Sequence, residues 1–276
     1  MMGGHSVQPS SFPGTMLPPP GTPGGIARRN EFIALLQEIT GDLRLLWLPS
    51  ISDTATTTGA CKNASVFTYD ATIAARISVL ESGVLVSFNG SSQYATVPDS
   101  AEFSFGDGAS DEAFTLFSVV NQTATATIKN VLTKYDVTTG LTKREWTYNF
   151  EAAEKVGLYL FDESVGARIG RVADAALATA TNLFTAATYD GSRSSAGIRL
   201  YSAAAVVAST ASDSGTYVAM ENTASLVRLG IIQAAAAPGE YFNGSMGMVG
   251  LSGGALTPDR LWQMKVAINA FYGSSL

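Results

Sequence analysis

Cysteine and histidine are almost missing from this sequence, which has one of each among 276 residues, Cys61 and His5. A single cysteine cannot form an intramolecular disulfide, and it fits best as a small apolar residue in a partly buried position. The histidine lies in a segment rich in proline and glycine, outside the folded body that we predict. These counts exclude a Ser-His-Asp or Cys-His catalytic site in that body, and a zinc site built from several such ligands.

Charged residues are also scarce, at 14% of the chain, and the formal net charge is −6. We expect no nucleic-acid partner, because such proteins use a basic surface to replace the counterions of the phosphates. Hydrophobic residues make up 46%, so much of the surface must consist of small polar residues. That composition suits a protein in a packed assembly or in a polar, protease-exposed setting.

Long hydrophobic runs are absent as well. No apolar run approaches the roughly 20 residues that cross a bilayer as a helix. The first 25 residues lack both the basic start and the apolar stretch of a secretion signal. We therefore expect no membrane insertion and no signal peptide.

Residues 1–27 are rich in proline and glycine and have no hydrophobic period. Proline fixes φ and removes a hydrogen-bond donor, and glycine loosens the backbone, so neither a helix nor a central strand is expected. One interpretation is a disordered tail. The other is an extended arm that docks on a neighbouring subunit, with Phe12, Met16 and Leu17 as its apolar anchors.

Two short helices are predicted, one on each side of a long region of strands. The first covers residues 28–41, where apolar residues recur on one face at helical spacing and Gly41 ends the helix. The second begins at Thr257, which caps it, with Pro258 at the first helical position. Gly273 ends this second helix.

Between the helices, short segments of alternating pattern recur at spacings of roughly 10 to 13 residues with turn residues between them. The clearest is Val84 to Pro98, which we interpret as a β-hairpin around the polar turn at 89–92. A second aromatic-Asn-Gly-Ser turn occurs at 241–245. This pattern predicts an all-β sandwich or barrel over residues 42–276 rather than an α/β fold.

The order of these pieces resembles the concanavalin A-like lectin and glucanase superfamily in its laminin G-like form. The likeness extends over about residues 43 to 272 and is carried by 45–49 (LLWLP), 86–98, 114–119, 187–191, Leu200-Tyr201, Leu229-Gly230, 241–246 and 255–258. The resemblance implies a jelly-roll sandwich of two antiparallel sheets, one of them concave. With the segments above, the expected protein is an all-β sandwich with an extended N-terminal arm, a short N-terminal helix and a C-terminal helix.

The sequence departs from the family in two places. The residues Ser202-Ala203-Ala204-Ala205 stand where an Asn-Gly turn often follows the aromatic. The Glu-x-Asp-x-x-Glu strand of the laminarinase-type enzymes does not occur. Neighbouring carboxylates such as Glu151 and Glu154 are better explained as solvated strand ends than as a hydrolytic pair. We therefore predict no enzyme; a glucanase, the third interpretation, would have to hydrolyse a β-glucan.

Sugar contacts would come from aromatic rings beside hydrogen-bonding groups. The candidates are Trp47, Tyr94, Tyr135, Trp146, Tyr148 and Tyr159. Trp146 and Tyr148 share one face of a strand by their spacing, so they are the preferred pair, with Tyr94 as a third contact. Such rings are also common in the core of a β-sandwich.

No cofactor is predicted, and calcium is the one metal that we consider. Asp107, Asp111 and Glu112 form a weak cluster of hard oxygen ligands around a glycine-rich loop. Solvation of a polar loop is the competing explanation for these carboxylates.

The leading functional hypothesis is a non-enzymatic structural protein of a bacteriophage particle, on the capsid or tail surface. Its arm would contact capsid or tail proteins and copies of itself, while the sandwich faces outward in weak contact with a cell-surface glycan. It would be assembled in the host cytoplasm and reside in the virion. The alternative is a carbohydrate-binding module of a secreted or surface bacterial protein, because a fold does not determine a function.

Overall fold

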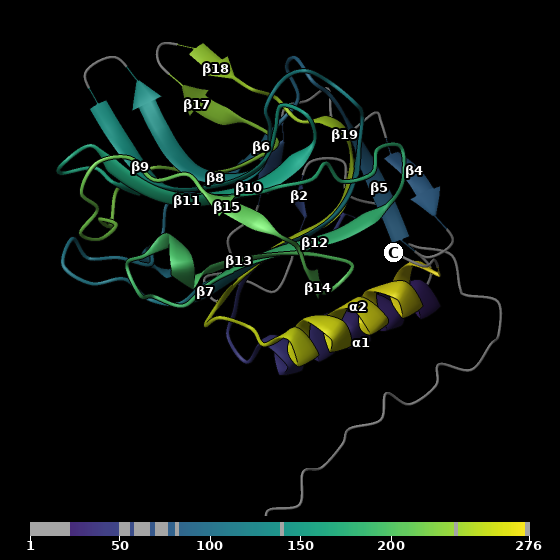
Figure 1. The fold of residues 1–276 in the computed structure, drawn as a ribbon. Coiled ribbons are helices and arrows are strands. Elements are labelled where there is room, and N and C mark those ends of the chain that lie inside the picture. The colour runs from purple at the N-terminus through teal and green to yellow at the C-terminus, as the bar shows by residue number, and fades with distance from the viewer. Residues whose placement is uncertain are drawn as a thin grey trace, which may run out of the picture.

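The computed structural model describes residues 23–49, 56–57, 67–69, 77–80, 83–138, 141–234 and 237–273. Within them, two sheets whose strands are almost all antiparallel stack face to face, and two helices cover the outer face of one sheet (Figure 1). The predicted all-β sandwich is therefore confirmed. The arm anchors Phe12, Met16 and Leu17 lie outside the described residues.

Sheet A has the strand order β14-β13-β12-β7-β19-β5-β4, and β1 also pairs with β19. The central strand β19 therefore lies between β7 on one side and both β5 and β1 on the other. The strands of sheet A are β1 (Leu43–Trp47), β4 (Ile77–Leu80), β5 (Gly83–Asn89), β7 (Phe114–Gln122), β12 (Leu183–Tyr189), β13 (Ile198–Ser202), β14 (Ala205–Val206) and β19 (Asn243–Gly253).

Sheet B has the order β15-β11-β10-β9-β8-β16-β6-β3-β2, and the β17-β18 pair joins it beside β8 through a parallel pairing. Its strands are β2 (Thr56–Thr57), β3 (Phe67–Tyr69), β6 (Ala95–Val97), β8 (Lys129–Thr138), β9 (Leu141–Glu151), β10 (Lys155–Asp162), β11 (Ala167–Ala173), β15 (Ser209–Ala211), β16 (Val227–Leu229), β17 (Ile232–Ala234) and β18 (Ala237–Gly239).

The segment from Val84 to Pro98 is not the hairpin that we predicted. Its two strands belong to different sheets, since β5 pairs with β4 and β19 whereas β6 pairs with β16 and β3. The Asn89 side chain accepts hydrogen bonds from the backbone N–H groups of Ser91 and Ser92, both at 3.0 Å. This turn therefore carries the chain from one layer to the other.

The two Asn-Gly turns noted in the sequence meet in space. Asn89 at the end of β5 is paired with Asn243 at the start of β19, and the N–H of Gly90 donates to the carbonyl of Phe242 at 3.0 Å. A side chain at position 90 would collide with Asn243, and φ there is +71°, so glycine is required. Segments about 150 positions apart thus close the same end of sheet A.

Two α-helices pack side by side on the outer face of sheet A (Figure 1). They are α1 (Pro23–Thr40) and α2 (Pro258–Tyr272), and the rings of Phe32 and Phe271 stack between them with centroids 4.2 Å apart. Within the described residues, the loops contain two 3-10 helices, η2 (Ala101–Phe103) and η3 (Ser195–Gly197). None of the helices in the described ranges has both the length and the apolar character needed to cross a bilayer.

The helix ends follow from local sequence. Helix α2 has the predicted form: the N–H of Arg260 donates to Thr257 Oγ1 at 3.3 Å, Pro258 occupies the first turn, and Gly273 ends the helix at φ +66°. Helix α1 differs from the prediction because it begins at Pro23 and includes residues 23–27, which we assigned to the arm. Proline is well suited to a first helical turn, where its missing N–H costs no hydrogen bond.

Candidate functional site

The preferred pair of glycan contacts does not reach the surface. Trp146 and Tyr148 both have no exposed area and lie in the core between the two sheets. Trp146 Nε1 donates to the carbonyl of Phe103 at 3.0 Å, and the Tyr148 hydroxyl donates to Thr185 Oγ1 at 2.6 Å. The spacing correctly put the two rings on one face of β9, but that face is the inner one. We therefore correct the prediction: in this structure neither ring can contact a glycan.

The other aromatic candidates of sheet B point outward but are covered. Tyr159 is 8% exposed, because the guanidinium of Arg168 lies over its ring at 5.0 Å. Tyr135 meets the ring of Phe161 edge to face at 5.3 Å, and Arg144 lies over that Phe161 ring. The guanidinium of Arg168 thus occupies a face of the Tyr159 ring that a sugar would need, and Tyr135 is half-buried against Phe161. Sheet B therefore presents no open aromatic platform at these positions.

Tyr94 lies at the turn between β5 and β6, half-buried, with its ring centroid 6.4 Å from that of Tyr241. Trp47, the last aromatic candidate, is fully buried in the core between the sheets. Of the three preferred glycan contacts, only Tyr94 keeps exposed surface, and its contact with a glycan stays a prediction.

The predicted calcium ligands serve separate structural roles. Asp107 accepts hydrogen bonds from the backbone N–H groups of its own loop, which lower the pKa of its carboxyl. Asp111 accepts from the hydroxyls of Tyr189 and Tyr217, both at 2.7 Å, and burial nevertheless raises its pKa. Glu112 lies at the surface. In the ranges that the structure describes, no three such residues come together as a metal site.

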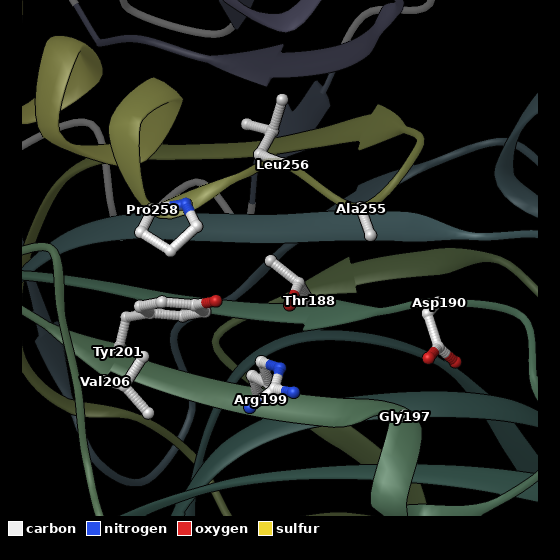
Figure 2. A pocket seen from close by; sticks show the side chains of 9 residues that line it. All are labelled: Thr188, Asp190, Gly197, Arg199, Tyr201, Val206, Ala255, Leu256 and Pro258. Atoms are coloured by element: carbon white, nitrogen blue, oxygen red, sulfur yellow. The ribbon is translucent and has the colours of Figure 1, made fainter.

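A polar pocket lies on the outer face of sheet A, at the point where α2 begins (Figure 2). Side chains on that face of β12 are Phe184, Ala186 and Thr188, and the first two pack under the helices. Thr188 lies directly opposite Arg199 of β13, and Tyr201 lies opposite Ala186. The face therefore changes from apolar to polar where the helices no longer cover it.

The pocket has a polar floor and mainly apolar walls. The floor is formed by side chains of β12 and β13, namely Thr188, Arg199 and Tyr201, and Asp190 lies at one end of the pocket (Figure 2). The remaining walls are formed by Val206 of β14, by Gly197, and by Ala255, Leu256 and Pro258. The volume of about 210 Å³ is below the roughly 300 to 1,000 Å³ of sites for drug-sized ligands. It can accept one ring-sized group rather than a large ligand.

Two hydroxyl groups in this pocket have no partner among the described residues. The Tyr201 side chain is 1% exposed and that of Thr188 is 3% exposed, yet both line the pocket. Figure 2 shows the Tyr201 hydroxyl directed toward Thr188. Polar groups on buried side chains are normally hydrogen-bonded, so these two are available to whatever fills the pocket. The guanidinium of Arg199, also without a partner in the described ranges, adds donors beside them.

The open end of the pocket depends on a glycine. Asp190 Oδ1 accepts from the N–H of Ser192 at 2.9 Å, which leaves Oδ2 without a partner in the part of the chain described. A Cβ at Gly197 would lie 2.0 Å from Asp190 Oδ1. Glycine at position 197 therefore leaves room for the carboxylate at the edge of the pocket.

The segment 254–256, of which Ala255 and Leu256 line the pocket, is held by Thr115 of β7. Its hydroxyl donates to the carbonyl of Gly254 at 2.8 Å and accepts from the N–H of Leu256 at 2.9 Å. Thr115 is paired with Thr188, so the same row of the sheet supplies both the floor and the support of the wall. The floor of the pocket is thus built on strands, and the loop that forms this wall is hydrogen-bonded to the same sheet.

None of the known protein families has a model that matches this chain, and no curated protein sequence matches it. The binding domain of Paraclostridial Mosquitocidal Protein 1 is similar in structure, with a TM-score of 0.54, 10% identity, and coverage of 86% of this chain and 56% of that one. Trypanosoma rangeli sialidase in complex with 2,3-difluorosialic acid is also similar, with a TM-score of 0.52 and 12% identity. The match covers 90% of this chain and 39% of the sialidase. The Ruminococcus gnavus IT-sialidase CBM40 bound to α2,3 sialyllactose has a TM-score of 0.45 and 18% identity. The match covers 58% of this chain and 84% of that one. The first two likenesses show a shared lectin-like jelly-roll fold.

Proposed function

We propose that this protein is a non-catalytic carbohydrate-binding module, and that its ligand occupies the polar pocket beside α2. The observation that carries the proposal is the pair of hydroxyls of Thr188 and Tyr201, which have no partner among the described residues and lie next to the guanidinium of Arg199. A sugar ring carries hydroxyls that both donate and accept hydrogen bonds, and it also has apolar C–H faces. The floor of the pocket suits the hydroxyls, and the walls from Val206 and Pro258 suit the C–H faces.

A binding role fits the pocket better than catalysis. Glycoside hydrolysis commonly uses two carboxylates about 5 to 9.5 Å apart. Among the described residues that line the pocket, Asp190 is the one carboxylate. A similar fold also forms the binding domain of the mosquitocidal protein, which supports a binding role. This function corresponds to the second hypothesis from the sequence, a module of a secreted or surface bacterial protein.

The double variant Thr188→Val/Tyr201→Phe is expected to lose glycan affinity by at least about tenfold, because the pocket loses two hydrogen-bonding groups. Its thermal stability is expected to stay close to that of the wild type, since neither hydroxyl bonds to the protein in the described ranges. A glycan array identifies the ligand, and calorimetric titration then measures the affinity.

Tyr148→Phe is the matched control, because it removes a tyrosine hydroxyl that does bond to the protein. We expect it to lower the free energy of unfolding by about 1 kcal/mol and to leave glycan affinity unchanged. The proposal is wrong if the wild type binds no glycan on the array, or if the double variant binds as tightly as the wild type.

A role in the assembly of a bacteriophage particle is a separate proposal, because it rests on the arm outside the described residues. Deleting residues 1–22 is expected to leave a folded body with an unchanged melting temperature, since α1 stays in place against α2. The truncated protein should no longer join its particle, which electron microscopy and gel densitometry of purified particles would measure. Assembly at normal occupancy would contradict this role.

A further inference from the structure

Trp262 differs from the two other tryptophans of the chain because it reaches the surface. It is 57% exposed, whereas Trp47 and Trp146 are 0% exposed. Among the described residues its indole makes no hydrogen bond and no ring contact. A single exposed apolar side chain is ordinary on a protein surface, so the exposure by itself indicates no function. The position of Trp262 on α2, close to the polar pocket, is the observation that suggests a function for this side chain.

Trp262 lies on the same side of α2 as a residue that lines the polar pocket. Pro258 is part of the pocket wall, and Trp262 follows it by four positions, one helical turn further on. Side chains on a helix lean toward its N-terminus, so the indole leans back toward Pro258 and the pocket. Val206 of β14, which packs against α2 and is 54% exposed, lies on the pocket wall as well.

We propose that Trp262 stacks against a second sugar ring, next to the ring held in the polar pocket. This inference rests on the carbohydrate-binding function proposed above. The pocket volume of about 210 Å³ accepts one ring, so a longer glycan must continue outside it. Pro258 and Val206 on the pocket wall are exposed, and Trp262, one helical turn beyond Pro258, would extend this apolar surface for that continuation. An indole provides a large rigid contact surface with few torsions to restrict on binding.

The chain therefore binds a glycan of at least two units, with hydrogen bonds selecting the first unit and stacking adding affinity for the second. Affinity is expected to rise by about tenfold or more from one unit to two in the wild type. Trp262→Ala should remove this gain and change affinity for the single sugar by less than about twofold. Its fold should be retained, because the removed side chain is mostly exposed.

The experiment uses the full chain and the sugar found on the glycan array, as its monosaccharide and as the disaccharide that contains it. Calorimetric titration measures both affinities in the wild type and in Trp262→Ala. In the wild type, a change in tryptophan emission on disaccharide binding additionally reports Trp262, since Trp47 and Trp146 are buried. Val165→Ala is the matched control, because Val165 is 59% exposed in the loop after β10. It is expected to leave both affinities unchanged.

The outcomes separate this inference from the function on which it rests. If the wild type binds no glycan, both fail. If it binds the monosaccharide and the disaccharide equally well and Trp262→Ala changes neither affinity, only the inference fails. It also fails if sedimentation shows that Trp262→Ala converts a dimer to a monomer while glycan affinities stay unchanged, since the indole then lies in a contact between copies of the chain.

Discussion

Replacing Trp146 by alanine is expected to lower the free energy of unfolding by about 3 to 5 kcal/mol. The indole has no exposed area, so the variant leaves a cavity in the core between the sheets. It also removes the Nε1 donor that lies 3.0 Å from the carbonyl of Phe103, which would then be buried without its partner. Urea denaturation followed by circular dichroism measures the loss as a lower midpoint at an unchanged m-value.

Trp262→Ala is the matched control for this measurement, because it removes the same side chain from the surface. Its free energy of unfolding should stay within about 0.5 kcal/mol of the wild type. Equal stability of the two variants would contradict the burial of Trp146. The same contrast shows why Trp146→Ala cannot test glycan binding: any lost affinity would reflect an unfolded fraction rather than a lost contact.

Replacing Lys134 by methionine is expected to cost about 3 to 5 kcal/mol at neutral pH. The ammonium group is fully buried and forms ion pairs with Glu145 and, at 2.9 Å, with Asp99. It also donates to Ser104 Oγ at 3.1 Å and to the carbonyl of Thr223 at 2.6 Å. Without Lys134, the Glu145 carboxylate stays buried with no opposite charge, which is the main source of the cost.

The pH dependence of this variant has a definite sign. Burial already raises the pKa of Glu145, although Lys134 acts in the opposite direction, so removal of Lys134 should raise it further. A carboxyl whose pKa is higher in the folded state than in the unfolded state lowers the stability of the fold as pH rises through the folded-state pKa. Below the unfolded-state pKa the carboxyl is protonated in both states, so this loss is absent. The deficit of Lys134→Met relative to the wild type should therefore be larger at about pH 8 than at about pH 4.

A second substitution tests this explanation. Glu145→Gln in the Lys134→Met background removes the uncompensated charge and keeps an acceptor for the N–H of Thr223, which lies 2.7 Å from Glu145 Oε1. The double variant is expected to be more stable than Lys134→Met at neutral pH and to lose most of the pH dependence. A double variant that is no more stable would show that packing, rather than charge, dominates the loss.

The layers of the fold could be predicted because their signals are local. Alternating residues mark strands such as β7 and β9, and Thr257, Pro258 and Gly273 mark both ends of α2. The pairing of strands could not be predicted in the same way. The turn at Asn89 has the composition of a hairpin, but the strands that it joins, β5 and β6, pair with partners in different sheets. Local turn chemistry does not decide that competition.

Periodicity places residues on a face without saying which face is covered. Trp146 and Tyr148 were correctly put on one side of β9, but nothing in the strand itself shows that this side meets the other sheet. The polar pocket was missed for a related reason. Thr188 and Arg199 are unremarkable within their strands, and they form a site because the start of α2 lies beside them. A break in the apolar pattern after Phe184 and Ala186 was the one available signal.

The place of β19 in sheet A affects how the chain can fold during synthesis. This strand separates β7 from β5 and β1, although all three precede it in sequence by well over a hundred residues. Until residues 243–253 have left the ribosome, those strands expose open edges that can pair with other nascent chains. We therefore expect slow folding of this chain and aggregation at high expression that chaperones reduce.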